Sequence, residues 1–263
     1  MDLNLTGKNY FLAASTKGIG FGVARQIAKD GGNLFVGGRT SESLKKGIEE
    51  LRKIGKGNIE GATLDASDKD SIKKWIETGL KSVGEPNGLL VNAGGPKAGF
   101  FMDFSDVEWE EAFNLTLMSA VRMIRGVLPF MLQKGGGSVV AVTSSSVKEP
   151  IDVLLLSNVF RSGVTSLLKS LSVEFGKYNI RFNNLVPGRI DTDRVRALDK
   201  LNADKKGISV EEQRRFEFSQ IPMGRYGDID EIGRAGAFLL SEASSYINGE
   251  TLIVDGGKTR TVW

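Results

Sequence analysis

The stretch Ala13-Ala14-Ser15-Thr16-Lys17-Gly18-Ile19-Gly20 decides the fold that we expect for this chain. It follows an aliphatic run at residues 9–13 and leads into an amphipathic run at residues 19–30. A glycine-containing turn between a first strand and a helix presents backbone N–H groups and the helix dipole to a diphosphate. The stretch therefore predicts a dinucleotide cradle. We expect right-handed or extended backbone at Ala14, because left-handed backbone there would cost about 1–2 kcal/mol.

Short apolar runs alternate with longer amphipathic ones along the rest of the chain. Runs that are aliphatic or β-branched and bounded by turn residues predict strands at residues 33–36, 59–63, 88–91, 138–142, 180–185 and 251–254. Helical patterns lie between them at residues 41–54, 69–83, 107–133, 158–177 and 229–240. This alternation predicts an α/β fold, a single Rossmann-type, doubly wound parallel sheet of about seven strands with helices on both faces. We expect residues 1–263 to form one domain.

Composition excludes several classes of site. The chain has no cysteine and no histidine, so disulfides, thiolate metal sites and a histidine base are absent, and no metal site is expected. The net charge is only +3, without a block of like charges, so nucleic acid is not an expected partner. An acid at position 2 argues against a secretory signal, and no apolar run approaches the roughly 18 residues of a membrane span. We expect a cytoplasmic protein without a membrane partner.

One long segment, residues 191–228, interrupts the alternation. It is rich in charged side chains, among them Arg194, Arg196, Arg214 and Arg215. A connection of this length in a compact domain is usually functional, which favours a substrate-side lid. The alternative is a solvated helical hairpin.

The end of the second strand indicates which dinucleotide is bound. NAD sites carry an acid at this place to hold the ribose hydroxyls. Here Gly38 occupies it, Arg39-Thr40 follow, and Lys17 lies on the facing loop. Cations without an acid suit a 2′-phosphate, which an arginine can grip with two hydrogen bonds. The pattern favours NADP over NAD, the alternative being two solvated cations at loop ends.

Four further motifs follow predicted strands. They are Asp65-Ala66, Asn92-Ala93-Gly94, Pro187-Gly188-Arg189-Ile190-Asp191-Thr192 and the tail from Ile221 to Gly257. Together with the first turn, these motifs resemble those of short-chain dehydrogenases/reductases, over essentially all of residues 1–257. The resemblance implies one NADP-binding Rossmann-type domain, homotetramers, and 3-oxoacyl reductase-like interconversion of a carbonyl and an alcohol in a small molecule. The cofactor contacts that it implies are Ser15, Thr16, Lys17, Gly18, Ile19, Gly20, Arg39, Thr40, Asp65, Ala66, Asn92, Ala93, Gly94, Arg161, Pro187, Gly188, Ile190 and Thr192.

The resemblance also implies a catalytic set, and here the chain departs from the family. Asn114 and Ser144 match the family's asparagine and serine. The neighbouring Ser145 or Ser146 could also be aligned with the family's serine. The family's tyrosine and the lysine four residues later are replaced by Ser157 and Arg161. No gap is needed to align these positions.

The substitution removes the usual proton donor. A serine hydroxyl has a pKa near that of water, far above neutrality, so bringing it to 7 would need about 11–12 kcal/mol. The guanidinium of Arg161 keeps its proton but can bind ribose hydroxyls or an anion. Lys148 is the leading replacement acid, because a desolvated lysine can reach a pKa of about 7–8. The alternative is that Lys148 belongs to an exposed turn.

Three functions remain open from the sequence. The first is an NADP-dependent oxidoreductase with a rebuilt site, for which Arg161 and the basic segment favour an anionic substrate. The second is a nucleotide-binding sensor or regulatory subunit without catalysis. A lyase or isomerase on the same scaffold is the third, and the lack of histidine weakens it.

Overall fold

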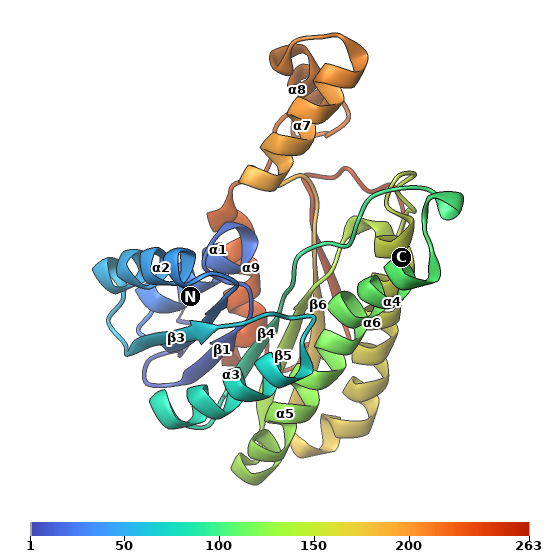
Figure 1. Cartoon of the computed structure of the whole chain (residues 1–263). Coiled ribbons are helices and arrows are strands. Elements are labelled where there is room, and N and C mark those ends of the chain that lie inside the picture. The colour runs from blue at the N-terminus through green and yellow to red at the C-terminus, as the bar shows by residue number, and fades with distance from the viewer. Residues whose placement is uncertain (1, 263) are drawn as a thin grey trace.

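The computed structural model describes residues 2–262, so the ends of the expected domain, Met1 and Trp263, lie outside the described residues. Seven parallel strands form one sheet in the order β3-β2-β1-β4-β5-β6-β7 (Figure 1). The expected doubly wound parallel sheet is therefore confirmed. The strands are β1 (Asn9–Leu12), β2 (Asn33–Gly38), β3 (Ile59–Thr63), β4 (Gly88–Val91), β5 (Gly137–Val142), β6 (Ile180–Pro187) and β7 (Thr251–Val254).

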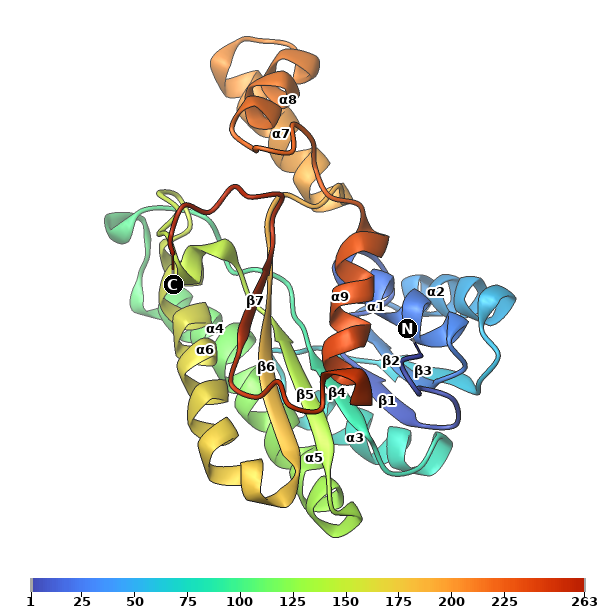
Figure 2. The same cartoon turned by 180° about the vertical axis from the view of Figure 1, so that it is seen from behind.

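Helices cover both faces of the sheet. One face carries α1 (Gly18–Lys29), α2 (Ser41–Ile54) and α9 (Ile229–Leu240), and the other carries α3 (Lys69–Ser82), α5 (Ser119–Lys134) and α6 (Leu155–Phe175) (Figures 1 and 2). The sequence bounds for these elements were right to within three residues, except that the helix expected at residues 107–133 is divided. Short 3₁₀ turns lie at Phe101–Asp103, Ser145–Val147, Gly176–Tyr178 and Glu242–Ser244.

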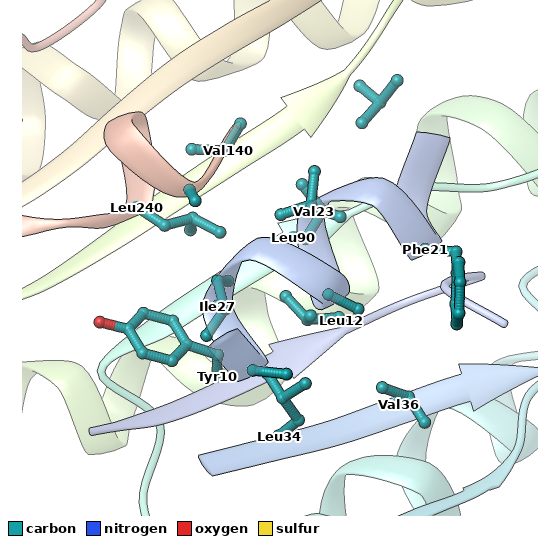
Figure 3. Close-up of a cluster of buried hydrophobic side chains, with 14 of the residues drawn as sticks. Tyr10, Leu12, Phe21, Val23, Ile27, Leu34, Val36, Leu90, Val140 and Leu240 are labelled. Atoms are coloured by element: carbon teal, nitrogen blue, oxygen red, sulfur yellow. The ribbon is translucent and has the colours of Figure 1, made fainter. Parts of the chain in front are cut away.

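Side chains alternate between the two faces along each strand, so the sheet contributes to one hydrophobic core on each face. Tyr10 and Leu12 of β1 face α1, where Val23 and Ile27 pack on them (Figure 3). Phe11, between them in sequence, points to the other face and joins the cluster under α3 and α5. Because strands of a central parallel sheet are buried on both sides, they appear as continuous apolar runs. The sheet is thus anchored from both faces, which fixes the loops at its carboxyl edge.

One helical stretch corrects the expectation about membrane spans. Helix α4 (Asp106–Phe113), a π-helical turn at Asn114–Met118 and α5 run on continuously, and this stretch is long and apolar enough to cross a membrane by length and composition. The sequence argument missed it because charged residues interrupt its apolar run. In the fold, α5 packs on α3, β4 and β5, with Met123 and Val127 fully buried. This is the setting of a core helix.

The segment at residues 191–228 folds into two helices, α7 (Asp193–Lys206) and α8 (Val210–Ser219), which project from the body of the sheet (Figures 1 and 2). Its shape is the helical hairpin that the sequence left as the alternative. Apolar periodicity did not indicate these helices because they bury polar side chains, namely Asp199, Gln213 and Glu217.

The backbone at Ala14 contradicts the sequence expectation. Its φ is 45°, which is left-handed, where we expected right-handed or extended backbone. The surrounding turn imposes this geometry: the Ser15 N–H donates to the Gly37 carbonyl at 2.9 Å, and the Ala13 N–H donates to the Leu90 carbonyl at 3.1 Å. Flanking residues are thus tied to β2 and β4, and the residue between them must adopt a positive φ.

Replacing Ala14 with glycine is expected to stabilise the protein. The change removes about 1–2 kcal/mol of backbone strain, of which the greater freedom of the unfolded chain cancels about 0.4–1 kcal/mol. Thermal unfolding of Ala14→Gly should show a melting temperature raised by about 1–4 °C. Ala13→Gly is the matched control, because Ala13 is buried without a positive φ, and should lower the melting temperature. A lower melting temperature for Ala14→Gly would contradict the strain.

Candidate functional site

The turn between β1 and α1 leaves the start of the helix open. Lys17 is the N-cap residue, yet its side chain makes no capping hydrogen bond, and the first turn of α1 carries no acid. Gly18 has a φ of 61°, and the buried Ser15 hydroxyl donates to the Leu12 carbonyl at 2.6 Å, which holds the turn. Free N–H groups at the positive end of a helix suit an anion such as a diphosphate.

The same turn is fixed to the loop after β4. The Asn92 side-chain amide donates to the Ala14 carbonyl at 3.0 Å. Gly20 packs against this contact so closely that a Cβ there would lie 2.6 Å from the Ala14 oxygen. A Cβ at Gly94, by contrast, would meet nothing within 4 Å. The two loops therefore form a rigid floor with open space above Gly94.

The end of β2 is crowded by the Thr16 side chain. A Cβ at Gly38 would lie 2.5 Å from Thr16 Cγ2, so any side chain at this position would require the Thr16 side chain to move. Arg39 is exposed beside it, and Thr40 caps α2 by accepting the Ser43 N–H at 3.2 Å. Hydrogen bonds from Ser67 lower the pKa of Asp65, and the charge of Arg39 lowers it a little further. Ala66 is buried under the same edge.

Ser157 and Arg161 lie one turn apart near the start of α6, and they touch. Arg161 Nε donates to the Ser157 hydroxyl at 3.2 Å, and its Nη1 donates to the Val142 carbonyl at 2.9 Å and the Thr143 carbonyl at 3.3 Å. Burial lowers the pKa of Arg161 to about 10, and the charge of Arg194 adds to this effect. The guanidinium thus stays protonated at neutral pH while it spans the end of β5.

A small hollow, with a cavity volume of about 20 Å³, lies between Arg161 and the loop after β4. Asn92, Ala93 and Gly94 line it on one side, and Thr116 and Thr143 line it on another. Within residues 2–262, the buried Oγ1 atoms of both threonines have no hydrogen-bond partner. A polar ligand would therefore find donors and acceptors here. The sequence analysis missed both threonines, although Thr143 adjoins the predicted Ser144.

The other predicted catalytic residues are less closely gathered. Asn114 begins the π-helical turn, where its side chain donates to the Glu110 carbonyl and accepts from Arg122, each at 3.0 Å. The Ser144 hydroxyl accepts the Ser146 N–H at 3.1 Å. Lys148 is half-buried, and its ammonium group forms no hydrogen bond or ion pair with the described residues.

The loop after β6 crosses from the sheet to the hairpin. A Cβ at Gly188 would lie 2.5 Å from the Asp255 backbone, so glycine allows this close approach. Pro187 ends β6, and Ile190 is buried. Thr192 caps α7 and places its Cγ2 within 3.6 Å of the Cβ position of Gly18. The start of the hairpin therefore lies close to the turn between β1 and α1.

A buried polar network at the base of the hairpin was not foreseen from the sequence. Arg189 pairs with Asp199 at 3.1 Å and with Glu217 at 2.8 Å. The Tyr226 hydroxyl donates to Asp199 at 2.9 Å, and burial together with this bond raises the pKa of Tyr226. The side-chain amide of Gln213 donates to Glu217 at 3.0 Å. One arginine thus joins both helices to the loop after β6.

This arrangement of strands, turns and loops is matched in known proteins. The sequence profile of the family described as enoyl-(acyl carrier protein) reductase matches residues 13–259. The chain belongs to the short-chain dehydrogenase/reductase family. Human dehydrogenase/reductase SDR family member 4 is 32% identical over 256 residues, covering 96% of this chain and 88% of that protein. The 3-oxoacyl-[acyl-carrier-protein] reductase FabG of Chlamydia pneumoniae is 29% identical, covering 98% and 100%.

Solved structures of short-chain dehydrogenases/reductases superpose over almost the whole chain. L-sorbose reductase from Gluconobacter frateurii, in complex with NADPH and L-sorbose, matches with a TM-score of 0.95 and 27% identity over 100% of both chains. A single-substitution variant of actinorhodin polyketide ketoreductase, in complex with NADPH, matches with a TM-score of 0.91 and 25% identity, covering 97% and 98%.

The network under the hairpin leads to a prediction about its stability. Arg189→Met would leave the buried Asp199 without an ion pair and Glu217 with only the longer pair to Lys258 at 3.7 Å, and breaking a buried pair typically costs about 3–5 kcal/mol. Hydrogen exchange should therefore show markedly faster exchange of the α7 and α8 amides. Arg196→Met is the control, because Arg196 pairs with Asp191 and Asp193 at the surface, where such pairs are worth about 1 kcal/mol or less. Equal exchange in both variants would refute the role of Arg189.

Proposed function

We propose that this chain is an NADP(H)-dependent oxidoreductase that interconverts a carbonyl and an alcohol in a small molecule. The open N-terminus of α1 carries this proposal, because the turn before it is tied through Ala14 to Asn92, which lines the hollow beside Arg161. A dinucleotide on this turn would lie next to the polar groups of that hollow. The bound dinucleotide would supply or accept the hydride, and residues 191–228 would act as the lid over the substrate.

Several observations support NADP over NAD. Gly38 stands where an NAD site carries the acid that holds the ribose hydroxyls, and a side chain there would have to push the Thr16 side chain aside. Lys17 and Arg39 are exposed at the same edge, where they can pair with a 2′-phosphate. L-sorbose reductase and the actinorhodin ketoreductase both crystallised with NADPH. We assign the predicted contacts, from Ser15–Gly20 to Thr192, to this cofactor.

The choice of cofactor can be tested at Arg39. Arg39→Ala should weaken NADPH binding by roughly 10- to 100-fold, because a hydrogen bond to a charged group contributes about 1.5–3 kcal/mol. NADH binding should change little, since NADH lacks the 2′-phosphate. Fluorescence titration of both cofactors measures this, with the exposed Arg52→Ala, on the far end of α2, as control. Equal losses for NADPH and NADH would exclude a 2′-phosphate contact.

For the chemistry, we propose that Ser157 and Arg161 occupy the family's tyrosine and lysine positions with different roles. Arg161 is protonated and anchors the nicotinamide ribose or a substrate anion, while Ser157 hydrogen-bonds to it. The pKa of a serine hydroxyl lies roughly 8 units above neutral pH, which keeps Ser157 from acting as the acid. Lys148 is the proposed proton donor, on the loop between Ser144 and α6. Asn114 and Ser144 orient the site.

Variants at these positions separate the roles. Ser157→Ala should reduce turnover by less than about tenfold, the value of one neutral hydrogen bond. Arg161→Ala should weaken cofactor or substrate binding by roughly 10-fold or more, with partial rescue by Arg161→Lys.

Lys148→Met should lower turnover by about 10²–10⁴-fold with cofactor binding intact, as expected for loss of a general acid. Steady-state kinetics with NADPH titrations measures all four variants. Turnover abolished by Ser157→Ala, with Arg161→Ala silent, would overturn these assignments.

A second candidate function rests on the orientation of Arg161. Hydrogen bonds from its Nε to Ser157 and from its Nη1 to the carbonyls of Val142 and Thr143 hold the side chain along the sheet edge. A nucleotide-binding sensor or regulatory subunit would need the cradle but not a reactive centre. Tight NADPH binding without turnover on any carbonyl compound would favour this function.

We further propose that the chain forms a homotetramer and acts in the cytoplasm. Exposed apolar side chains on α4 and α6 support pairing of these helices between subunits: Val107, Phe113, Val159 and Val173. Closed symmetry is the usual form of such assemblies. Light scattering at micromolar concentration should give four times the 28.5 kDa mass of the chain. A monomer mass would refute the proposal.

A further inference from the structure

The π-helical turn at Asn114–Met118 forms part of the wall of the hollow beside Arg161. Its Thr116 lines the hollow with a buried hydroxyl oxygen that has no hydrogen-bond partner among residues 2–262. The Ser119 hydroxyl, at the start of α5, donates to the Leu115 carbonyl at 2.6 Å and so holds the turn. Turns of this kind are rare and are frequent at functional sites. The placement of this turn therefore decides where one polar wall of the hollow lies.

Both polar atoms of the Asn114 side chain are engaged along the helical stretch. The side-chain amide donates to the Glu110 carbonyl at 3.0 Å, and Oδ1 accepts from Arg122 Nη2 at 3.0 Å. Arg122 follows about two turns later, on α5. Because Asn114 is the first residue of the π-helical turn, the guanidinium of Arg122 fixes the start of this turn.

The same guanidinium reaches the loop after β3. Arg122 Nη1 donates to the Ser67 carbonyl, at the longer distance of 3.5 Å. The Asp65 carboxylate accepts from the Ser67 N–H at 2.9 Å and from the Ser67 hydroxyl at 2.7 Å, which holds the loop. These bonds lower the pKa of Asp65, and the charge of Arg39 lowers it further, so Arg39 lies close to this loop. Arg122 therefore bridges the hollow and the end of the site where the 2′-phosphate is proposed to bind.

We propose that Arg122 is a positioning residue that couples the two ends of the dinucleotide site. When the 2′-phosphoadenosine end binds beside Arg39, it orders the loop at Ser67, and Arg122 then holds Asn114 and the π-helical turn in place. Thr116 is thereby fixed on the wall of the hollow. A ligand that orders one end lowers the entropic cost of ordering the other. The inference rests on the proposed function, because it takes the ligand beside Arg39 to be an adenine nucleotide.

Adenosine 2′-monophosphate tests this coupling, because it carries adenine and the 2′-phosphate but no nicotinamide. In full-length wild-type protein, saturation with this nucleotide should slow hydrogen exchange of the amides at residues 114–118 by about 10-fold, the effect of one hydrogen bond to a charged group. Arg122→Met should bind the nucleotide with similar affinity in calorimetric titrations, yet its exchange at these residues should not respond to the nucleotide. Arg122→Lys should respond partially, since one ammonium group cannot reproduce the fork of a guanidinium.

Arg125→Met is the matched control. Arg125 is an exposed arginine of the next turn of α5, without a hydrogen bond or ion pair among the described residues, so its variant should respond as wild type does. A merely structural role of Arg122 would have a different signature. Exchange at residues 114–118 of Arg122→Met would then be faster in the free protein, with the effect of the nucleotide unchanged.

The results that would overturn the coupling have different meanings. Wild-type protein that binds neither this nucleotide nor NADPH would remove the proposed function together with the coupling. Wild-type protein that binds the nucleotide without slower exchange at residues 114–118, or with the same slowing in Arg122→Met, would remove the coupling alone. A full wild-type response of Arg122→Lys would also contradict the two-sided bridge. Unchanged circular dichroism of both Arg122 variants is expected, since the side chain is only half-buried.

Discussion

The hydrogen bond from the Asn92 side chain to the Ala14 carbonyl is the constraint on which the site depends. It joins the turns after β1 and β4, the two strands between which the order of the sheet reverses. Ligands of open α/β sheets bind in the crevice at this reversal. In this bond the Ala14 carbonyl points toward Asn92, and the Ala14 backbone is left-handed. Gly20 allows the close packing, because it has no side chain that would meet the Ala14 oxygen. The floor of the crevice is therefore fixed before any ligand binds.

Above this floor the site is built mainly from cations. Arg161 spans the end of β5, Arg194 lies on Gly95, and Lys17 and Arg39 flank the edge of β2. Such a site suits a molecule with several negative charges, and it holds few groups that can move a proton. The pKa of a serine hydroxyl lies too far from neutrality for Ser157 to replace a tyrosine. Our proposal therefore assigns binding to the arginines and proton transfer to Lys148.

The sequence predicted the sheet well because buried parallel strands leave continuous apolar runs, as at Gly88–Val91 and Gly137–Val142. It did not indicate α7 and α8, since these helices bury Asp199 and Glu217 and so lack apolar periodicity. The sequence motifs located the turn between β1 and α1, but the spacing of residues in the sequence carries no information on the direction in which a side chain points. The contacts of Arg161 with the β5 carbonyls and of Arg194 with Gly95 therefore needed the fold. The same limit explains the wrong expectation for Ala14, whose φ is set by distant strands.

The central claim is that this scaffold still transfers hydride although Ser157 and Arg161 stand where a tyrosine and a lysine are usual. Deuterium transfer from C4-labelled NADPH, with protein in excess over substrate, tests it directly, because mass spectrometry detects even slow turnover. Suitable carbonyl compounds include L-sorbose and 3-oxoacyl thioesters, which the names of similar proteins specify. The account predicts labelled alcohol with wild-type protein and about 10²–10⁴-fold slower labelling with Lys148→Met. Tight NADPH binding with no label in any product would contradict it.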